Sequence, residues 1–194
     1  MIDKVKIETV ASAIFSKHYK IGIPSKIILK IIAKEGIKLR EIDGDKNFLG
    51  AFHKTRKKAP YIFINRKIEN IGRKNFTIAH ELGHFVLEHH LQKASFLCGE
   101  NEIEEKGKVS WQEKEANYFA SCFLLPKDKV KKEFTDWFRG WFGYGRKLCL
   151  EVQPTNGESY RNWKIIRKKL IDKYVVSEAA LKIRLVELGL VNNF

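Results

Sequence analysis

The sequence predicts an α+β fold, on the basis of three observations. Helical segments are expected at both ends of the chain, short β-branched and aromatic runs occur within residues 37–65, and a largely apolar helix follows them. The chain of 194 residues has 44% hydrophobic and 31% charged side chains, which suits a globular protein with a buried core. We therefore expect a single domain over residues 1–194, with a small sheet and a helical C-terminal part.

The first two elements are expected to be helices. Residues 5–18 show mixed helical spacing. A second helix is predicted over residues 26–34, with Ser25 as its N-cap and Gly36 just past its end. Three runs separated by turn residues then predict the strands of a small antiparallel sheet: residues 37–42, 48–53 and 61–65.

The middle of the chain is expected to hold two helices joined by a loop. Asn75 is the expected N-cap of a helix over residues 76–90. Residues 91–110 contain two glycines and a charged run, so we predict a loop there. The next helix begins at residue 111 or 112 and is terminated by Pro126, which can also open a further helix through about residue 138.

The last third of the chain combines an irregular segment with two helices. Residues 139–160 are rich in glycine and in aromatic residues, as in the run RGWFGYG at residues 139–145, and we predict an irregular insertion there. Helices are expected near residues 160–174 and 178–188. Ser177 is the expected cap of the second of these helices, and Gly189 fits the position just after its end.

The composition argues against a secreted or membrane-spanning protein. The first eight residues alternate charged and apolar side chains, unlike a signal peptide, and no apolar run approaches the ~20 residues that cross a bilayer. The three cysteines, Cys98, Cys122 and Cys149, form no CxxC pair, so neither a disulfide framework nor a cysteine zinc site is indicated. We expect a cytoplasmic protein with no membrane partner.

The net charge of +14 is unevenly distributed. Residues 76–126 carry more acidic than basic side chains, whereas both flanking segments are basic. A basic surface can attract nucleic acid or an acidic partner, or can simply keep the protein soluble. The charge alone does not decide between these roles.

The strongest functional pattern is His80-Glu81-Leu82-Gly83-His84 on the apolar helix. Residues four apart lie on the same helix face, so His80 and His84 can offer two imidazole nitrogens to one metal ion. Glu81 is displaced by about 100° around the axis and can take a proton from a water at the metal instead of ligating. Zinc is the expected metal, and a catalytic zinc usually has three protein ligands and one water.

Three residues are candidates for the third ligand. Glu113 and Glu115 lie on the helix that begins at residue 111 or 112, and helical periodicity does not separate them. His90 stands six residues after His84, the spacing of the metzincin pattern, but Leu87 occupies the position where that pattern requires glycine. We therefore interpret His89 and His90 as exposed histidines at a helix end.

The chain resembles the ImmA/IrrE-type metallopeptidases. The resemblance rests on two motifs that are specific as a pair, residues 75–84 (NFTIAHELGH) and residues 113–120 (EKEANYFA), the second followed by FLLP at residues 123–126. The strand at residues 61–65 and the tail from Val176 to Leu190 are also similar to the family. Together these segments cover most of residues 20–190.

The resemblance implies a zincin-like fold, a cytoplasmic location and a zinc site. It makes Glu113 the third zinc ligand beside His80 and His84, with Asn117 orienting His80. It also implies that the substrate is a protein, in this family typically a DNA-binding transcriptional repressor. Leu125 stands where methionine is common, and residues 139–160 are unlike the compact family core.

The mechanism expected on this basis makes Glu81 the general base. An oxyanion donor besides the metal is needed, for which Tyr61, Arg66 and Tyr118 are candidates. We expect an extended substrate to pair with the edge of the sheet near residues 61–65.

Two other functions remain open at this point. The protein can be a metal-dependent regulator that binds a repressor without rapid proteolysis. It can also be a DNA-binding protein, because residues 163–190 form two basic helices joined by a short turn. The second of these helices is strongly apolar, whereas a recognition helix keeps an exposed polar face.

Overall fold

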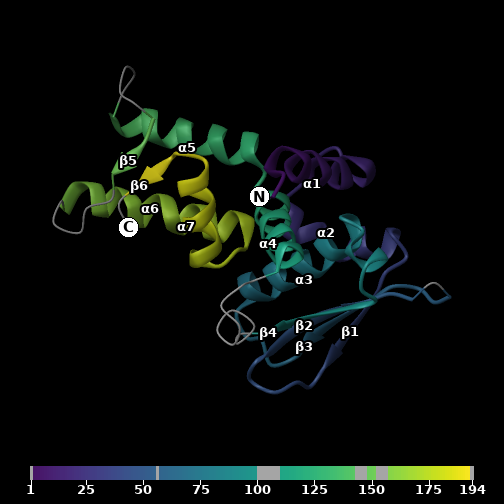
Figure 1. Ribbon diagram of the computed structural model, residues 1–194. Helices are drawn as coiled ribbons and strands as arrows, with labels where there is room; N and C mark the ends of the chain where they lie inside the picture. Colours follow the sequence, from purple (N-terminus) through teal and green to yellow (C-terminus); the bar gives the residue numbers. More distant parts are fainter. Residues whose placement is uncertain (1, 56, 100–109, 143–147, 152–156, 193–194) are drawn as a thin grey trace.

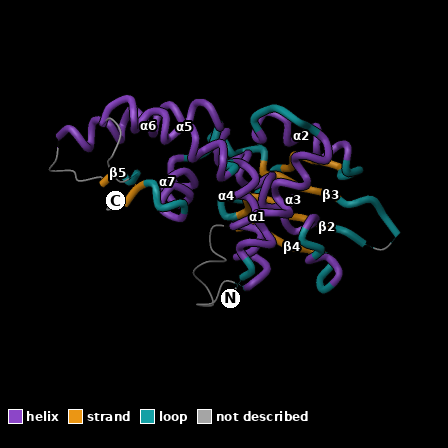
Figure 2. The backbone as a smooth tube through the Cα atoms, turned by 90° about the horizontal axis from the view of Figure 1, so that it is seen from above, coloured by secondary structure: helices purple, strands orange, loops and turns teal. Residues whose placement is uncertain are grey.

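A computed structural model describes residues 2–55, 57–99, 110–142, 148–151 and 157–192 (Figure 1). One sheet lies at the base of the molecule as drawn, with helices above it, and a second group of helices extends to the side (Figures 1 and 2). This arrangement of helices and a small sheet confirms the predicted α+β class.

The sheet has four strands, β1 (Lys38–Ile42), β2 (Phe48–His53), β3 (Tyr61–Asn65) and β4 (Ser95–Gly99), in the order β1-β3-β2-β4. Strand β2 is antiparallel to both β3 and β4, but β1 and β3 are parallel. The prediction of an antiparallel sheet is therefore wrong in this detail, because the sheet is mixed.

The side chain of Asn65 stabilises the connection that accompanies the parallel pair. The connection from β1 to β2 crosses the end of β3 instead of forming a tight hairpin. Asn65, the last residue of β3, donates from Nδ2 to Asp45 O at 2.9 Å and to Phe48 O at 2.7 Å. Its Oδ1 accepts from Gly44 N at 3.4 Å. These bonds satisfy the crossing backbone, and β3 takes the place between β1 and β2.

Two helices precede the sheet, α1 (Lys4–His18) and α2 (Pro24–Lys34). Helix α2 starts earlier than predicted, with Pro24 in its first turn, where the fixed φ of proline suits a helix. Ser25 is not the cap. Its hydroxyl instead donates to Tyr174 O, on a helix near the C-terminus.

Helix α3 (Ile71–Val86) carries the histidine motif and differs from the prediction at both ends. Asn70 is its N-cap, accepting from Arg73 N at 2.9 Å, whereas Asn75 lies inside the helix and donates to Val175 O at 2.9 Å. The helix ends before Glu88, which has a left-handed φ of 60° and turns the chain into the short 3-10 helix η1 (His89–Leu91).

The segment after η1 contains a strand that was not predicted from the sequence. Residues 95–99 form β4, the edge of the sheet next to β2, within the predicted loop 91–110. Residues 100–109 of that loop lie outside the described part of the chain. Helix α4 (Trp111–Leu124) then begins where predicted, with Ser110 as its cap.

The C-terminal part consists of α5 (Lys127–Phe142), α6 (Gly157–Tyr174) and α7 (Glu178–Glu187), with a short parallel pair of strands, β5 (Leu150–Glu151) and β6 (Val191–Asn192). The predicted insertion 139–160 is helical at both ends, and its residues 143–147 and 152–156 lie outside the described part. Ser177 caps α7, and Gly189 has a φ of 66°, both as predicted.

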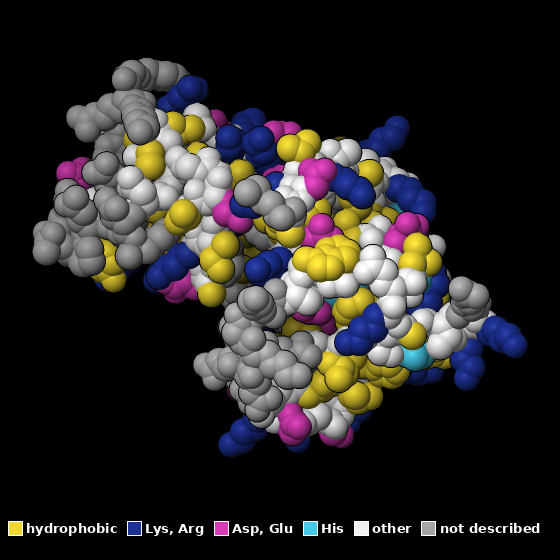
Figure 3. Space-filling view, in the orientation of Figure 1, with side chains coloured by type: hydrophobic (Ala, Val, Ile, Leu, Met, Phe, Trp, Pro, Cys, Tyr) yellow, Lys and Arg dark blue, Asp and Glu magenta, His cyan; other side chains and the backbone are white. Residues whose placement is uncertain are grey.

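The described helices do not include one long and apolar enough to cross a membrane. On the face drawn in Figure 3, lysine and arginine side chains are spread over several elements with acidic side chains between them. Among the described side chains visible on that face, the basic ones do not gather in a single patch.

Candidate metal centre

Helix α3 presents two buried histidines one turn apart. His80 and His84 are 2% and 0% exposed, and their Nε2 atoms lie 3.1 Å apart. Glu81 is also fully buried. One ligand atom from each of these three side chains lies within 4.8 Å of the others, and the described residues contain no second group of this kind. This cluster can hold a metal ion.

A carboxylate from α4 meets both histidines. Glu113 Oε2 lies 3.0 Å from His80 Nε2, and Glu113 Oε1 lies 3.3 Å from His84 Nε2. Ser110 sets the start of α4, because its Oγ accepts a hydrogen bond from Glu113 N at 3.2 Å. The close packing of α4 on α3 depends on Gly83, where a Cβ would lie only 3.0 Å from Phe119 Cδ1.

The two other candidate ligands lie elsewhere. Glu115 Oε2 is 3.1 Å from His89 Nε2. His90 Nε2 is 3.0 Å from Lys54 Nζ, and its ring stacks on Phe85 with 6.0 Å between centroids. The end of α3 before Glu88 turns His90 away from the histidine pair. Of the three alternatives, the fold brings Glu113 to His80 and His84.

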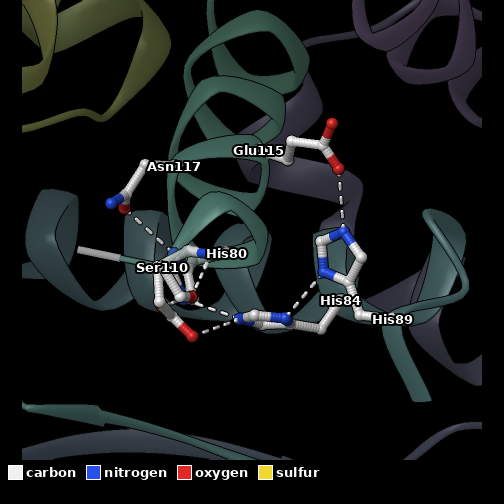
Figure 4. Close-up of polar contacts among 7 residues, drawn as sticks. His80, His84, His89, Ser110, Glu115 and Asn117 are labelled. Carbon is white, nitrogen blue, oxygen red and sulfur yellow. Dashed lines mark hydrogen bonds and ion pairs between the residues drawn. The ribbon is translucent and has the colours of Figure 1, made fainter. Parts of the chain in front are cut away.

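Each motif histidine has a partner on its other ring nitrogen (Figure 4). His80 Nδ1 lies 3.0 Å from Asn117 Oδ1, the contact that the family resemblance implies. His84 Nδ1 lies 2.9 Å from His89 Nδ1. His89 is 1% exposed, so its interpretation as an exposed helix-end histidine is wrong. The spacing of His89 gave no signal, because the left-handed Glu88 breaks the helical repeat.

The cluster is electrostatically suited to a cation. Burial raises the pKa of Glu113, but its contacts with His80 and His84 outweigh burial and hold that pKa at about 2. Burial lowers the pKa of His84 to about 4, so its ring is neutral near pH 7. Burial also opposes charge on His80, yet the nearby carboxylates of Glu113 and Glu81 raise its pKa. An ionised carboxylate thus faces two imidazoles in a buried site.

Two residues of the sheet shape the floor of the site. Phe96 on β4 stacks on His84, with ring centroids 4.2 Å apart. Gly50 on β2 leaves space for the base candidate, because a Cβ there would lie 3.1 Å from Glu81 Oε1 and 2.7 Å from Thr77 Cγ2.

None of the three candidate oxyanion donors is seen in contact with the cluster. Tyr118 donates from its hydroxyl to Glu8 at 3.4 Å, and Arg66 pairs with Asp43 at 3.3 Å. Tyr61 stacks on Phe63 within β3, with centroids 5.8 Å apart. These side chains are engaged elsewhere in the fold.

The expected substrate edge is also occupied. Strand β3 lies between β1 and β2 and pairs with both, so an extended peptide cannot add to residues 61–65. The prediction of pairing at β3 is therefore wrong. The connection from β1 to β2 crosses the end of β3, so β3 lies inside the sheet and has no free edge for a peptide.

One comparison with known proteins gives a match. The model of the M78 peptidase family, described as the IrrE N-terminal-like domain, matches residues 32–140, more than half of the chain. This range includes β1 to β4, α3 and α4 and therefore the whole histidine and glutamate cluster. No curated protein matches the chain significantly.

Proposed function

Because this chain belongs to the M78 peptidase family, with an IrrE N-terminal-like domain, we propose that it is a zinc-dependent endopeptidase acting on a protein in the cytoplasm. The family supports a metallopeptidase-type function. The observation that carries the more specific proposal is the convergence of Glu113 on the Nε2 atoms of His80 and His84, with Glu81 beside them.

The donor set fits zinc. Two imidazoles and one carboxylate are a common set of protein ligands in catalytic zinc sites, which keep a further position for water or substrate. We assign His80, His84 and Glu113 as the ligands. A zinc ion bound there supplies Lewis-acid chemistry, which polarises a carbonyl and lowers the pKa of water.

We assign proton transfer to Glu81. Its carboxylate belongs to the same compact cluster as the ligand nitrogens but comes from a different side of α3. A carboxylate in this place can accept a proton from the attacking water and return it to the leaving amine. Glu81→Gln keeps the shape of the side chain but removes the base, so cleavage should fall by roughly 10²–10⁴-fold while zinc stays bound.

Strand β4 is the edge at which we expect the substrate backbone to bind. Among the described residues it pairs with β2 alone, and its Phe96 contacts His84. A peptide added to this edge would run past the histidine pair in an extended conformation. Main-chain pairing gives affinity with little sequence preference, so specificity needs further contacts.

The substrate that we propose is a DNA-binding transcriptional repressor, as the family resemblance implies. The test uses the zinc-loaded protein with a repressor encoded beside its gene, and follows cleavage by mass spectrometry. Cleavage at one site, lost with Glu81→Gln and with a chelator, supports the proposal.

Two other results would favour a different function. A stable complex with an intact repressor would indicate a metal-dependent regulator that binds its partner without proteolysis. Salt-sensitive binding of DNA by the chain alone would revive the DNA-binding alternative.

A further inference from the structure

A hydrogen-bonded row of three side chains, His84, His89 and Glu115, leads from the metal centre to α4 (Figure 4). His84 Nδ1 lies 2.9 Å from His89 Nδ1, and His89 Nε2 lies 3.1 Å from Glu115 Oε2. This row of side chains begins on α3, passes through η1 and ends in the first turns of α4. Glu115 is the glutamate that does not reach the two motif histidines.

The hydrogen-bond chemistry allows one arrangement when His84 ligates. A metal at His84 Nε2 needs the lone pair of that atom, so the ring proton must sit on Nδ1. His84 Nδ1 then donates to His89 Nδ1, which must accept. The proton of neutral His89 is therefore on Nε2, where it donates to the Glu115 carboxylate.

Packing shields these three side chains from water. His84 and His89 are 0% and 1% exposed, and the Glu115 side chain is 19% exposed. The ring of Trp111 meets His89 edge to face at 5.5 Å between centroids, and Phe96 covers His84. Hydrogen bonds in such surroundings are stronger than in water, and a missing partner is correspondingly costly.

We propose that His89 and Glu115 are positioning residues for the metal centre, which fix the tautomer and ring orientation of His84 through a carboxylate–imidazole–imidazole chain. The proposal rests on the metal site of the proposed function. The ring of His80 is oriented more simply, because its Nδ1 donates directly to Asn117 Oδ1 at 3.0 Å. The two motif histidines are therefore oriented by different means.

Substitutions at His89 separate orientation from simple packing. The Oδ1 of asparagine can occupy the place of His89 Nδ1, so His89→Asn keeps an acceptor for His84 but loses the link to Glu115. His89→Leu fills much of the space and offers no acceptor. Outer-shell partners of metal ligands typically contribute about 10- to 100-fold to metal affinity.

The experiment measures zinc affinity by competition with a chromophoric chelator, for each variant that is folded by circular dichroism. We expect His89→Leu to weaken zinc binding by about 10- to 100-fold, His89→Asn to recover most of this loss, and Glu115→Ala to weaken binding by about tenfold. His90→Leu is the matched control, because His90 contacts Lys54 and Phe85 instead of the cluster, and it should bind zinc like the wild type.

A second readout reports the tautomer directly. In the zinc-loaded wild type, the His84 Nδ1 proton should give a slowly exchanging downfield NMR signal, and this signal should persist in His89→Asn and disappear in His89→Leu. A merely space-filling role for His89 would not produce that difference between the two variants.

The proposal is overturned if folded His89→Leu binds zinc as tightly as His90→Leu, or if His89→Asn is no better than His89→Leu. If His89→Leu does not fold, Glu115→Ala decides, and wild-type zinc affinity in that variant would overturn the proposal. Failure of the proposed function looks different, because the wild-type protein would then either bind no zinc at His80 and His84 or bind zinc and leave the repressor intact.

Discussion

Gly50 is a position where one added methyl group should affect both stability and catalysis. A Cβ there would lie 2.7 Å from Thr77 Cγ2 and 3.1 Å from Glu81 Oε1. The first contact is about 1 Å inside the favourable separation of two carbon atoms, so α3 or the strand must shift. We expect Gly50→Ala to lower the free energy of unfolding by about 1–3 kcal/mol, the usual cost of overpacking.

The expected effect on catalysis has a separate cause. The contact with Glu81 Oε1 is only a few tenths of an ångström too short, and it should displace the carboxylate by a similar distance. Since a misplacement of about 1 Å can cost roughly 10²-fold, we expect kcat/KM to fall by about tenfold.

A double variant distinguishes the two effects. Thr77→Ser removes Cγ2 but keeps the hydroxyl that donates to Arg73 O at 3.1 Å. Gly50→Ala combined with Thr77→Ser should therefore recover stability relative to the sum of the single changes, whereas the loss of kcat/KM should remain. Urea denaturation of the wild type, the two single variants and the double variant gives the coupling free energy between the two positions. Cleavage assays on the same four proteins give kcat/KM.

Gly140 on α5 offers a control, because a Cβ there would meet nothing within 4 Å. Gly140→Ala should stabilise the protein by about 0.5–1 kcal/mol, as expected for alanine in a helix. Wild-type stability and activity in Gly50→Ala would refute the reasoning. A double variant without any recovery of stability would show that the Thr77 contact is not its source.

Two further predictions concern parts of the fold away from the metal. Val175 follows α6 with a left-handed φ of 52°, which is unfavourable for a β-branched residue. Val175→Gly should therefore stabilise the protein by about 1 kcal/mol. Thermal unfolding measures this effect, and a lower midpoint would contradict the prediction. Burial raises the pKa of the Cys122 thiol to about 12. At pH 8 a thiol reagent should therefore modify Cys98 and Cys149 first in the native protein, and Cys122 only after denaturation. Mass spectrometry identifies the modified cysteines, and rapid modification of Cys122 in the folded chain would count against its burial.

The parts of the site that could be predicted depend on local spacing. His80 and His84 lie on one face of α3 because any helix places residues four apart in that way. Glu81 is next to them for the same reason. The choice of Glu113 over Glu115 could not be made from spacing alone, because it depends on how closely α4 packs on α3 at Gly83.

The errors all involve contacts between distant residues or a single backbone turn. Strand β3 lies inside the sheet, and Asn65 holds the connection from β1 to β2 across its end. Asn75 was a plausible cap by residue type, but the helix begins five residues earlier and Asn75 binds Val175 O instead. The buried position of His89 follows from one left-handed residue, Glu88, which no periodic pattern signals.

Other expectations remain predictions. The irregular structure expected within residues 139–160 stays a prediction for residues 143–147 and 152–156, which lie outside the described part of the chain. That residues 1–194 form one domain is supported by sequence length alone. The repressor substrate depends on the family resemblance and on the experiment described above.

Metal analysis of the purified protein tests the central claim most directly. We expect about one zinc per chain in the wild type, no bound zinc when His80 and His84 are both changed to alanine, and a large loss of affinity with Glu113→Ala, because each change removes a ligand. The loss with Glu113→Ala should exceed that with Glu115→Ala. Full zinc content in the chain that lacks both histidines would contradict the account and place the metal elsewhere.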